Sequence, residues 1–398
     1  MMKLLIVASA ASAWSLGVPK GLPKTPTRAL QQQRQQNQVI AAAPASTTAL
    51  KATEVTGGAK SEDGLMETLK TGSFFALWYL FNIGYNIYNK KALNAMAIPW
   101  TMALLQLFVG IPYVAALWAT GLRKAPKLTT DNIKTLVPVS LGHLGTHIGA
   151  VISLGAGAVS FTHIIKASEP VVSAGLSAVM LGAVYSPITY ATLLPIVGGV
   201  ALATVKELSF AWGALLGAVV SDLALALRNV YSKLALSGPS KEGEERLSPA
   251  NLFGVLTVLS TAVSIPLALA MEGPQFGAVW AAAAAQFGAG KLALYTTLTG
   301  LYFYAYSEVA MKALNNVHPV THAIGNTMRR VVIMLVCIGV FGTPMTPLAA
   351  MGSVLAIGGS FLYSMVKAEE KRKAKEAVLD AKLAQALPLK VDAEKKVE

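Results

Sequence analysis

The chain has 398 residues, of which 54% are hydrophobic and only 13% are charged, and its mean hydropathy is +0.53. A soluble domain carries about 25% charged residues, so this composition excludes an ordinary soluble protein and predicts a helical protein with many membrane spans. The net charge of +13 lies largely in the leader and the loops, without a basic run interleaved with aromatic residues, and therefore does not predict a nucleic-acid partner.

The first residues are typical of a two-part targeting leader. Lys3 precedes an apolar run that ends in Ala-Ser-Ala, which predicts a signal peptide over residues 1–13. Residues 14–55 are basic and rich in Gln, as in a transit peptide, and residues 56–71 would form a stromal N-terminal segment. Such a leader resembles those of algae whose plastids have extra envelope membranes. The alternative is a secretory leader followed by a disordered tail.

Ten apolar segments follow, each long enough to span a bilayer. They lie at 72–93, 97–121, 132–153, 157–182, 187–205, 209–236, 249–271, 290–314, 318–341 and 346–366. Ten spans place both termini on one side, together with the basic loop at 123–127 and the charged C-terminal tail at 367–398, as the positive-inside rule favours. Lys90 and Lys91 fall on the other side, against that rule.

Short matches between the first five segments and the last five indicate an internal repeat. They pair Asn86–Leu93 with Asn229–Leu236, and Thr162–Ile165 with Thr321–Ile324. His147 and Tyr306 each lie 15 residues before the matching Thr. An odd number of spans per half inverts the second half, so we expect two inverted five-helix repeats at 72–205 and 209–366. Inverted repeats around a polar site are typical of secondary transporters.

Ionisable residues recur within these apolar segments. Each costs roughly 2.5–3.5 kcal/mol at membrane depth on insertion scales and therefore indicates a functional site or a partner. The cations are Lys166, Arg228, Arg329 and Arg330, and the anions are Glu169, Asp222 and Glu308. Some of these groups must pair, but several cations together suit a divalent anion such as an organic phosphate. An empty site of this kind is electrostatically unfavourable, which favours exchange over net transport.

Other residue patterns give weaker indications of function. His143 and His147 have the i,i+4 spacing of metal ligands but no H-E-x-x-H motif, so no metal is expected and His147 is interpreted as a hydrogen-bond donor to a ligand. Cys337 is the single cysteine and is interpreted as a small apolar residue. No Walker or dinucleotide motif predicts a cofactor. Glycines in the spans are expected to make close helix contacts; they are Gly142, Gly145, Gly149, Gly198, Gly199, Gly213 and Gly217.

Several long motifs resemble the plastid triose-phosphate/phosphate translocator family of the drug/metabolite transporter superfamily. They are Ser160–Pro170, Arg228–Lys233, Pro319–Arg330, Glu207–Trp212 and Asn86–Lys91. The likeness covers roughly residues 70–368. It implies the drug/metabolite-transporter fold, and strict counter-exchange of inorganic phosphate with phosphorylated three-, five- or six-carbon compounds across the inner plastid envelope.

The resemblance also implies roles for individual residues. Lys166, Arg329 and Arg330 would bind phosphate with help from Arg228, while His147 and Tyr306 would contact the rest of the substrate. Supporting positions are His163, Thr162, Glu169, Asp222, Glu308 and Asn326. The chain departs from the family pattern with Arg329 where Lys is usual, with Ala150 in place of a small hydroxyl residue, and with Asp222 and Glu308 where neutral amides are common. Thr321-His322 looks like the triose-phosphate and phosphoenolpyruvate branches, and Asn326-Thr327-Met328 like the hexose-phosphate branch.

The expected function is antiport of phosphate with triose phosphate or 3-phosphoglycerate by alternating access, in a monomer or dimer within a lipid bilayer. The helix near Glu169 and Pro170 is expected to bend. A carrier of the same fold for phosphoenolpyruvate, pentose phosphate, hexose phosphate or nucleotide sugar is the alternative. A membrane enzyme would need a nucleophile with a base, or carboxylates clustered for a metal, and we find no such set. A receptor or scaffold would tolerate neutralisation of the buried cations.

Overall fold

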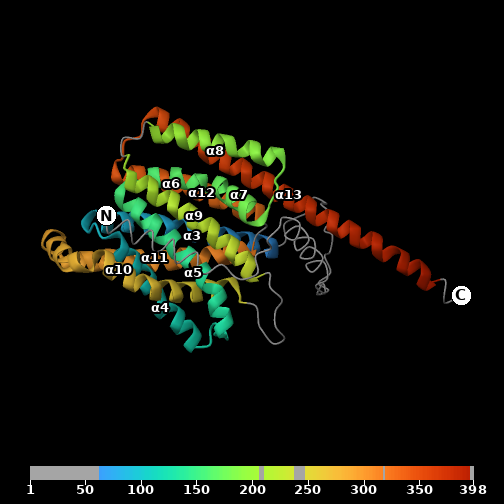
Figure 1. The fold of residues 1–398 in the computed structure, drawn as a ribbon, viewed down its shortest axis with the longest axis horizontal. Helices are drawn as coiled ribbons and strands as arrows, with labels where there is room; N and C mark the ends of the chain where they lie inside the picture. Colours follow the sequence, from blue (N-terminus) through green and yellow to red (C-terminus); the bar gives the residue numbers. More distant parts are fainter. Residues whose placement is uncertain (1–61, 206–209, 237–246, 317–318, 395–398) are drawn as a thin grey trace.

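A computed structural model describes residues 62–205, 210–236, 247–316 and 319–394, and within these ranges the regular structure is helical (Figure 1). The predicted signal and transit peptides at 1–13 and 14–55 lie outside the described residues. The first half contains α3 (Glu62–Ala95), α4 (Pro99–Ala119), α5 (Thr130–Ala156), α6 (Val159–Ile165), the 3-10 turn η1 (Lys166–Ser168), α7 (Glu169–Leu181) and α8 (Pro187–Val205). The second half contains α9 (Trp212–Leu236), α10 (Pro249–Phe287), α11 (Ala289–Asn316), α12 (Pro319–Phe341) and α13 (Pro347–Glu394).

Eight stretches of the described residues are long and apolar enough to cross a membrane, with α6, η1 and α7 forming one of them. The predicted spans in α3 and α11 are not among these eight, so the expected total of ten remains a prediction. Polar residues lower the hydropathy of α3, which includes Asn82, Asn86 and Asn89. These three amides are buried against neighbouring helices, so they are not exposed to lipid.

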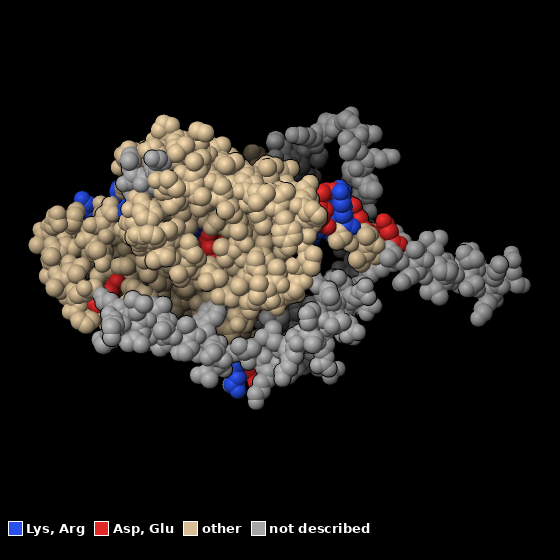
Figure 2. Space-filling view, turned by 45° about the horizontal axis from the view of Figure 1, so that its top comes forward, with Lys and Arg blue, Asp and Glu red and all other residues tan. Residues whose placement is uncertain are grey.

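The outer surface of the bundle is apolar, as a lipid-facing surface requires. Leu194 on α8 and Val354 on α13 are among the most exposed large side chains, at 72% and 73%. Figure 2 shows that Lys, Arg, Asp and Glu are sparse on this face and gather beside the bundle, where α13 leaves it. There Arg372 pairs with Glu369 and Glu376 one turn away on either side, which stabilises an exposed helix.

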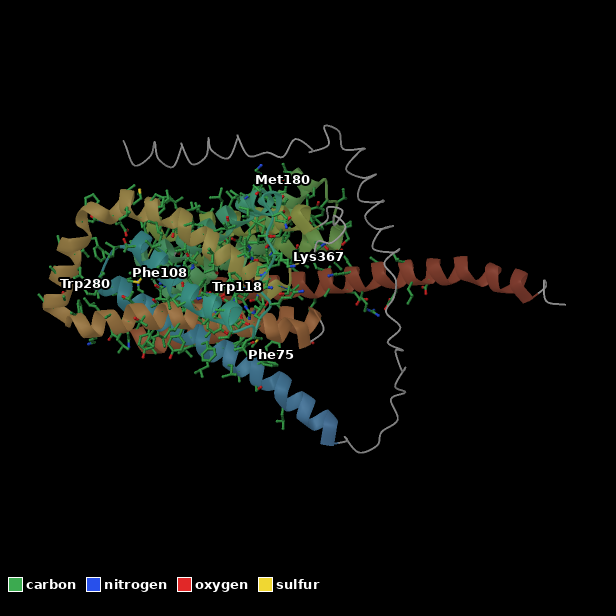
Figure 3. The ribbon with its side chains drawn as sticks, turned by 90° about the horizontal axis from the view of Figure 1, so that it is seen from below. Phe75, Phe108, Trp118, Met180, Trp280 and Lys367 are labelled. Atoms are coloured by element: carbon green, nitrogen blue, oxygen red, sulfur yellow. The ribbon has the colours of Figure 1, made fainter. Side chains whose placement is uncertain are left out.

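Three helices extend beyond the predicted spans. α3 begins at Glu62, so residues 62–71 of the predicted N-terminal segment continue the first helix. α10 runs to Phe287 past Pro266 and Pro274, and α13 runs through the predicted tail to Glu394. In Figure 3, Trp280 on α10 and Lys367 on α13 mark opposite ends of the bundle. The Lys367 ammonium lies 3.9 Å from the centre of the Tyr185 ring, so the connection before α8 holds α13 where it leaves the bundle.

The helices pack in pairs that correspond between the halves. α5 packs along α9, and α3 packs along α11. In the order of the five spans, α5 corresponds to α11 and α9 corresponds to α3, so one of these pairs is the counterpart of the other. The same correspondence maps the pair α4–α10 and the pair α8–α13 onto themselves. This is the correspondence that two repeats of five spans predict.

Glycines allow the closest of these pairs to form. A Cβ on Gly149 of α5 would lie 2.7 Å from the main-chain oxygen of Gly217 on α9, and one on Gly199 would lie 2.3 Å from the main-chain nitrogen of Ala356 on α13. The predicted packing role is therefore confirmed at these positions, and Gly142, Gly145 and Gly213 also face a neighbouring helix. It is wrong for Gly198, whose Cβ would meet no atom within 4 Å, because this residue is on the outward face of α8.

Lys90 and Lys91, which oppose the positive-inside rule, both have partners in the protein. The Lys90 ammonium donates hydrogen bonds of 2.8 Å to the main-chain oxygens of Leu154 and Gly157 at the C-terminal end of α5. Free carbonyls at a helix C-terminus attract a cation. The Lys91 ammonium lies 5.6 Å from the centre of the Tyr88 ring. Both lysines therefore have a structural role at this end of the bundle.

Candidate functional site

The fourth predicted span is interrupted at Lys166, in the middle of the bundle. α6 ends at Ile165, η1 covers Lys166–Ser168, and α7 begins at Glu169 with Pro170 in its first turn. Pro170 has no N–H, so it cannot donate the regular helical bond to the main-chain oxygen of Lys166. The bend expected near Glu169 and Pro170 is therefore present as a break in the helix.

Side chains satisfy the carbonyls that the break releases. Arg330 donates to the main-chain oxygen of Lys166 at 2.7 Å, and Ser360 donates to that of Ala167 at 2.7 Å. Ser168 donates to the main-chain oxygen of Ile165 at 2.7 Å. Irregular backbone at membrane depth is stable only when its polar groups find such partners. The break thus belongs to the packed structure and brings α12 and α13 against η1.

Two of the predicted cations are paired with two of the predicted anions. The Lys166 ammonium lies 3.0 Å from a carboxylate oxygen of Asp222 and donates to the Ser221 hydroxyl at 2.7 Å. The Arg330 guanidinium lies 2.6 Å from a carboxylate oxygen of Glu169. These pairs join η1 to α9 and α7 to α12, so the two halves meet at this cluster.

Arg329 differs from its neighbour because no carboxylate of the described residues pairs with it. It donates to the side-chain oxygen of Asn326 at 2.9 Å, and its guanidinium carbon lies 5.0 Å from the centre of the Trp78 ring. Its Nε is buried and has no hydrogen-bond partner in the part of the chain that the structure describes. The i,i+3 spacing of Asn326 and Arg329 puts both on one face of α12. Arg329 is a half-buried cation with donor capacity left for an anion.

Arg228 on α9 is held loosely at the edge of the same cluster. Its contacts are 3.4 Å to a ring nitrogen of His143 and 3.4 Å to the side-chain oxygen of Asn229. It lies within electrostatic range of Glu169 and of Tyr306. Long contacts of this kind leave most of its guanidinium donors available.

His147 and Tyr306, the residues paired by the repeat, meet around one aromatic ring. The centre of the His147 ring lies 4.3 Å from that of Phe303, and the centre of the Tyr306 ring lies 5.5 Å from it. Tyr306 lies within electrostatic range of Arg329 and Arg228. The buried Nε2 of His147 has no hydrogen-bond partner among the described residues. The structure therefore places Tyr306 near the cations and His147 across the Phe303 ring from it.

The supporting positions divide into those near the cluster and those away from it. His163 contacts the Asn86 side chain at 3.1 Å and lies within electrostatic range of Arg330, Arg329 and Lys166. Thr162 instead shares a 2.8 Å hydrogen bond with the buried hydroxyl of Ser153, which is a contact between α6 and α5.

Glu308 lies apart from the cluster. Its carboxylate forms an ion pair with Arg123, in the connection after α4, and both Tyr113 and Tyr304 lie within electrostatic range of this pair. Its predicted place among the supporting residues does not agree with this geometry, because the partner of Glu308 is a loop arginine rather than Lys166 or Arg330.

Two groups of residues beside the site did not emerge as site residues from the sequence. Trp78 supplies the ring that packs on Arg329. Buried amides of α3 form two sets of hydrogen bonds: Asn86 donates to Asn82, and Asn89 bonds with Tyr85 and Gln106. The spacing of Asn82, Asn86 and Asn89 on one face of α3 is a signal that helical periodicity offers. No such signal identifies Trp78, since its contact crosses from α3 to α12.

Comparisons with known proteins add to this geometry. The model of the Triose-phosphate Transporter family matches residues 69–364. A chloroplastic glucose-6-phosphate/phosphate translocator of Arabidopsis thaliana is 38% identical over 302 residues, which is 76% of each chain. A xylulose 5-phosphate/phosphate translocator of the same plant is 38% identical and covers 79% of this chain and 75% of that one. A phosphoenolpyruvate/phosphate translocator of Oryza sativa subsp. japonica is also 38% identical, over 84% of each chain.

Proposed function

This chain belongs to the triose-phosphate transporter family, and we propose that it exchanges inorganic phosphate for triose phosphate or 3-phosphoglycerate across a plastid envelope membrane. Members of this family are transporters, which supports a carrier rather than an enzyme. The observation that carries the proposal is the state of Arg329. A guanidinium next to Arg330, with its Nε buried and with no carboxylate partner among the described residues, is suited to bind a phosphate through two parallel hydrogen bonds.

The geometry supports a binding site shared between the halves. Lys166 belongs to the first half and Arg228, Arg329 and Arg330 to the second. A phosphate between them would replace the contacts that Lys166 and Arg330 now make with Asp222 and Glu169. Alternating access would follow if the halves rock around this ion, because the bound anion holds the two sets of cations together in both orientations.

Exchange rather than net transport follows from the charge of the empty site. Arg329 and Arg228 lack carboxylate partners among the described residues. Moving uncompensated charges through the closed intermediate is costly in a medium of low dielectric constant. A bound phosphate lowers this cost, so each half-cycle requires an anion.

The alternative is a carrier of the same fold with another exchange partner: phosphoenolpyruvate, a pentose or hexose phosphate, or a nucleotide sugar. The similar proteins of this family are named for glucose 6-phosphate, xylulose 5-phosphate and phosphoenolpyruvate at equal identity, so identity does not choose among them. We further propose that the membrane is the envelope of a complex algal plastid, on the strength of the two-part leader, and that the carrier is a monomer or dimer.

The test is uptake of labelled phosphate into liposomes that contain the purified protein. The liposomes are preloaded with phosphate, dihydroxyacetone phosphate, 3-phosphoglycerate, phosphoenolpyruvate, glucose 6-phosphate or buffer alone, and Lys166→Ala is measured beside the wild type. We expect rapid uptake only into loaded vesicles, the highest rate with triose phosphate or 3-phosphoglycerate, and loss of uptake in the variant.

Each result has a distinct meaning. Equal uptake into empty and loaded vesicles would overturn the exchange mechanism. An active Lys166→Ala variant would overturn the site, and a preference for another load would replace the proposed exchange partner while leaving the mechanism intact.

A further inference from the structure

Asp222 is a carboxylate at the centre of the bundle whose side chain is shielded from solvent. It is 0% exposed, and one of its oxygens contacts the Lys166 ammonium at 3.0 Å. The Ser168 hydroxyl oxygen lies 3.4 Å from its other oxygen. The proposed phosphate site therefore contains a fixed negative charge of its own, bound to the lysine that would bind phosphate.

The backbone leaves Asp222 little freedom to move away. α9 is pressed against α5 at the contact of Gly217 with Gly149, one turn before Asp222. The neighbouring Ser221 donates to the main-chain oxygen of Thr146 on α5 at 2.7 Å. Because both contacts hold α9 on α5, Asp222 stays within the site when a ligand binds.

The charged groups around Asp222 come from each element that packs on it. They are Lys166 on η1, Glu169 on α7 and Arg330 on α12. On α5, His143 contacts Arg228 and His147 contacts Phe303, and on α6 His163 contacts Asn86. Asp222 is thus surrounded by the groups of the site itself.

The ionisable side chains of the empty site have a net charge of +2, which two negative charges on a ligand would neutralise. Its cations are Lys166, Arg228, Arg329 and Arg330, and its carboxylates are Asp222 and Glu169. Among the described residues these four cations exceed the two carboxylates by two. A doubly charged phosphate monoester with no other charge neutralises the site, whereas a ligand with an additional carboxylate gives it a net negative charge.

We propose that Asp222 matches the site to dianions and selects phosphorylated compounds whose remaining part is uncharged over those that also carry a carboxylate. The inference rests on the proposed function and narrows it, since it favours triose phosphate over 3-phosphoglycerate and phosphoenolpyruvate. A unit charge about 10 Å from Asp222, at an effective dielectric constant near 20, changes relative binding by roughly ten-fold. Replacing Asp222 with Asn removes this repulsion and keeps the shape of the side chain.

The experiment measures phosphate uptake at pH 8 into liposomes loaded with dihydroxyacetone phosphate or phosphoenolpyruvate. At this pH the phosphate groups of both compounds carry two charges, so the two loads differ by the carboxylate. We expect the wild type to prefer dihydroxyacetone phosphate. Asp222→Asn should shift the ratio of the two rates roughly ten-fold toward phosphoenolpyruvate. Glu308→Gln is the matched control, because it removes one buried carboxylate outside the site, and it should leave the ratio unchanged.

A second comparison uses the wild type alone, in case Asp222→Asn does not fold. Vesicles are loaded with 3-phosphoglycerate or with its carboxyl methyl ester, which lacks the additional charge, and the ester should be the better load. A wild type that prefers the free acid, or a ratio that Asp222→Asn leaves unchanged, would overturn the inference. Phosphate–phosphate exchange in the same vesicles distinguishes this failure from a failure of the proposed function, because it does not depend on the carboxylate.

Discussion

The guanidinium of Arg330 donates a 2.7 Å hydrogen bond to the main-chain oxygen of Lys166 and, through its other terminal nitrogen, binds Glu169. This carbonyl accepts the Glu169 N–H in the 3-10 turn, and Pro170, four residues later, has no N–H to offer it as a second donor. One arginine therefore bridges the broken helix of the first half and α12 of the second. Arg330 therefore links the break in the helix to the proposed binding site.

Restoring the missing donor tests this coupling. Pro170→Ala supplies an N–H that competes with Arg330 for the Lys166 carbonyl and favours a continuous helix. We expect phosphate exchange to fall several-fold while the thermal midpoint in detergent is kept or raised. Pro187→Ala is the control, since Pro187 begins α8 and its N–H would have no intrahelical partner. Unchanged exchange in Pro170→Ala would show that the break has no part in transport.

The two neighbouring arginines should respond differently to loss of charge. Arg330→Gln leaves Glu169 and the Lys166 carbonyl without their partner. Breaking a buried ion pair in this way costs about 3 kcal/mol of folding free energy. Both exchange and thermal stability should therefore fall. Arg329→Gln removes a cation that pairs with no carboxylate of the described residues, so exchange should be lost with little effect on stability. The measurements are phosphate exchange in liposomes and the thermal midpoint in detergent. Equal destabilisation by both changes would contradict the assignment of Arg329 to the ligand.

The ion pair of Glu308 with Arg123 should contribute to stability without affecting exchange. Glu308→Gln leaves a partly buried guanidinium without its anion, so the thermal midpoint should fall. Phosphate exchange per folded molecule should stay within about two-fold of the wild type, because the pair is outside the central cluster. Loss of exchange at full stability would place Glu308 in the substrate path after all.

Two glycine substitutions form a matched pair in the packing of the helices. Gly149→Ala forces a methyl group to within 2.7 Å of the Gly217 carbonyl, where backbone rather than a flexible side chain must move. Overpacking of this kind costs about 1–3 kcal/mol, and the displaced α9 would also carry Asp222 away from Lys166. Gly198→Ala meets no atom within 4 Å and should be neutral or slightly stabilising. The measurement is the thermal midpoint of each variant in detergent. An equal change of the midpoint in both variants would refute the close crossing of α5 and α9.

Patterns within one helix proved readable from the sequence. The Pro in Ser160–Pro170 correctly indicated a bend. Apolar segments long enough to span a bilayer indicated the fold class. The count of ten spans stays a prediction, because α3 and α11 are not among the eight apolar stretches of the described residues.

Contacts between helices could not be read in the same way. Lys166 was expected to belong to a group of cations and carboxylates, but its pairing with Asp222 rather than Glu169 depends on how α9 lies against η1. Thr162 and Glu308 carry polar groups at membrane depth, like the site residues, yet they contact Ser153 and Arg123.

The sequence by itself therefore determined the fold class and the charged residues of the central cluster, since hydropathy and helical periodicity act over neighbouring residues of one segment. Only the tertiary structure decided which charge neutralises which, because ion pairs form between side chains far apart in the chain. Their distances are set by the crossing of helices at contacts such as that of Gly149 with Gly217. The pairing of Asp222 with Lys166, and with it the charge left for a ligand, is a property of that packing.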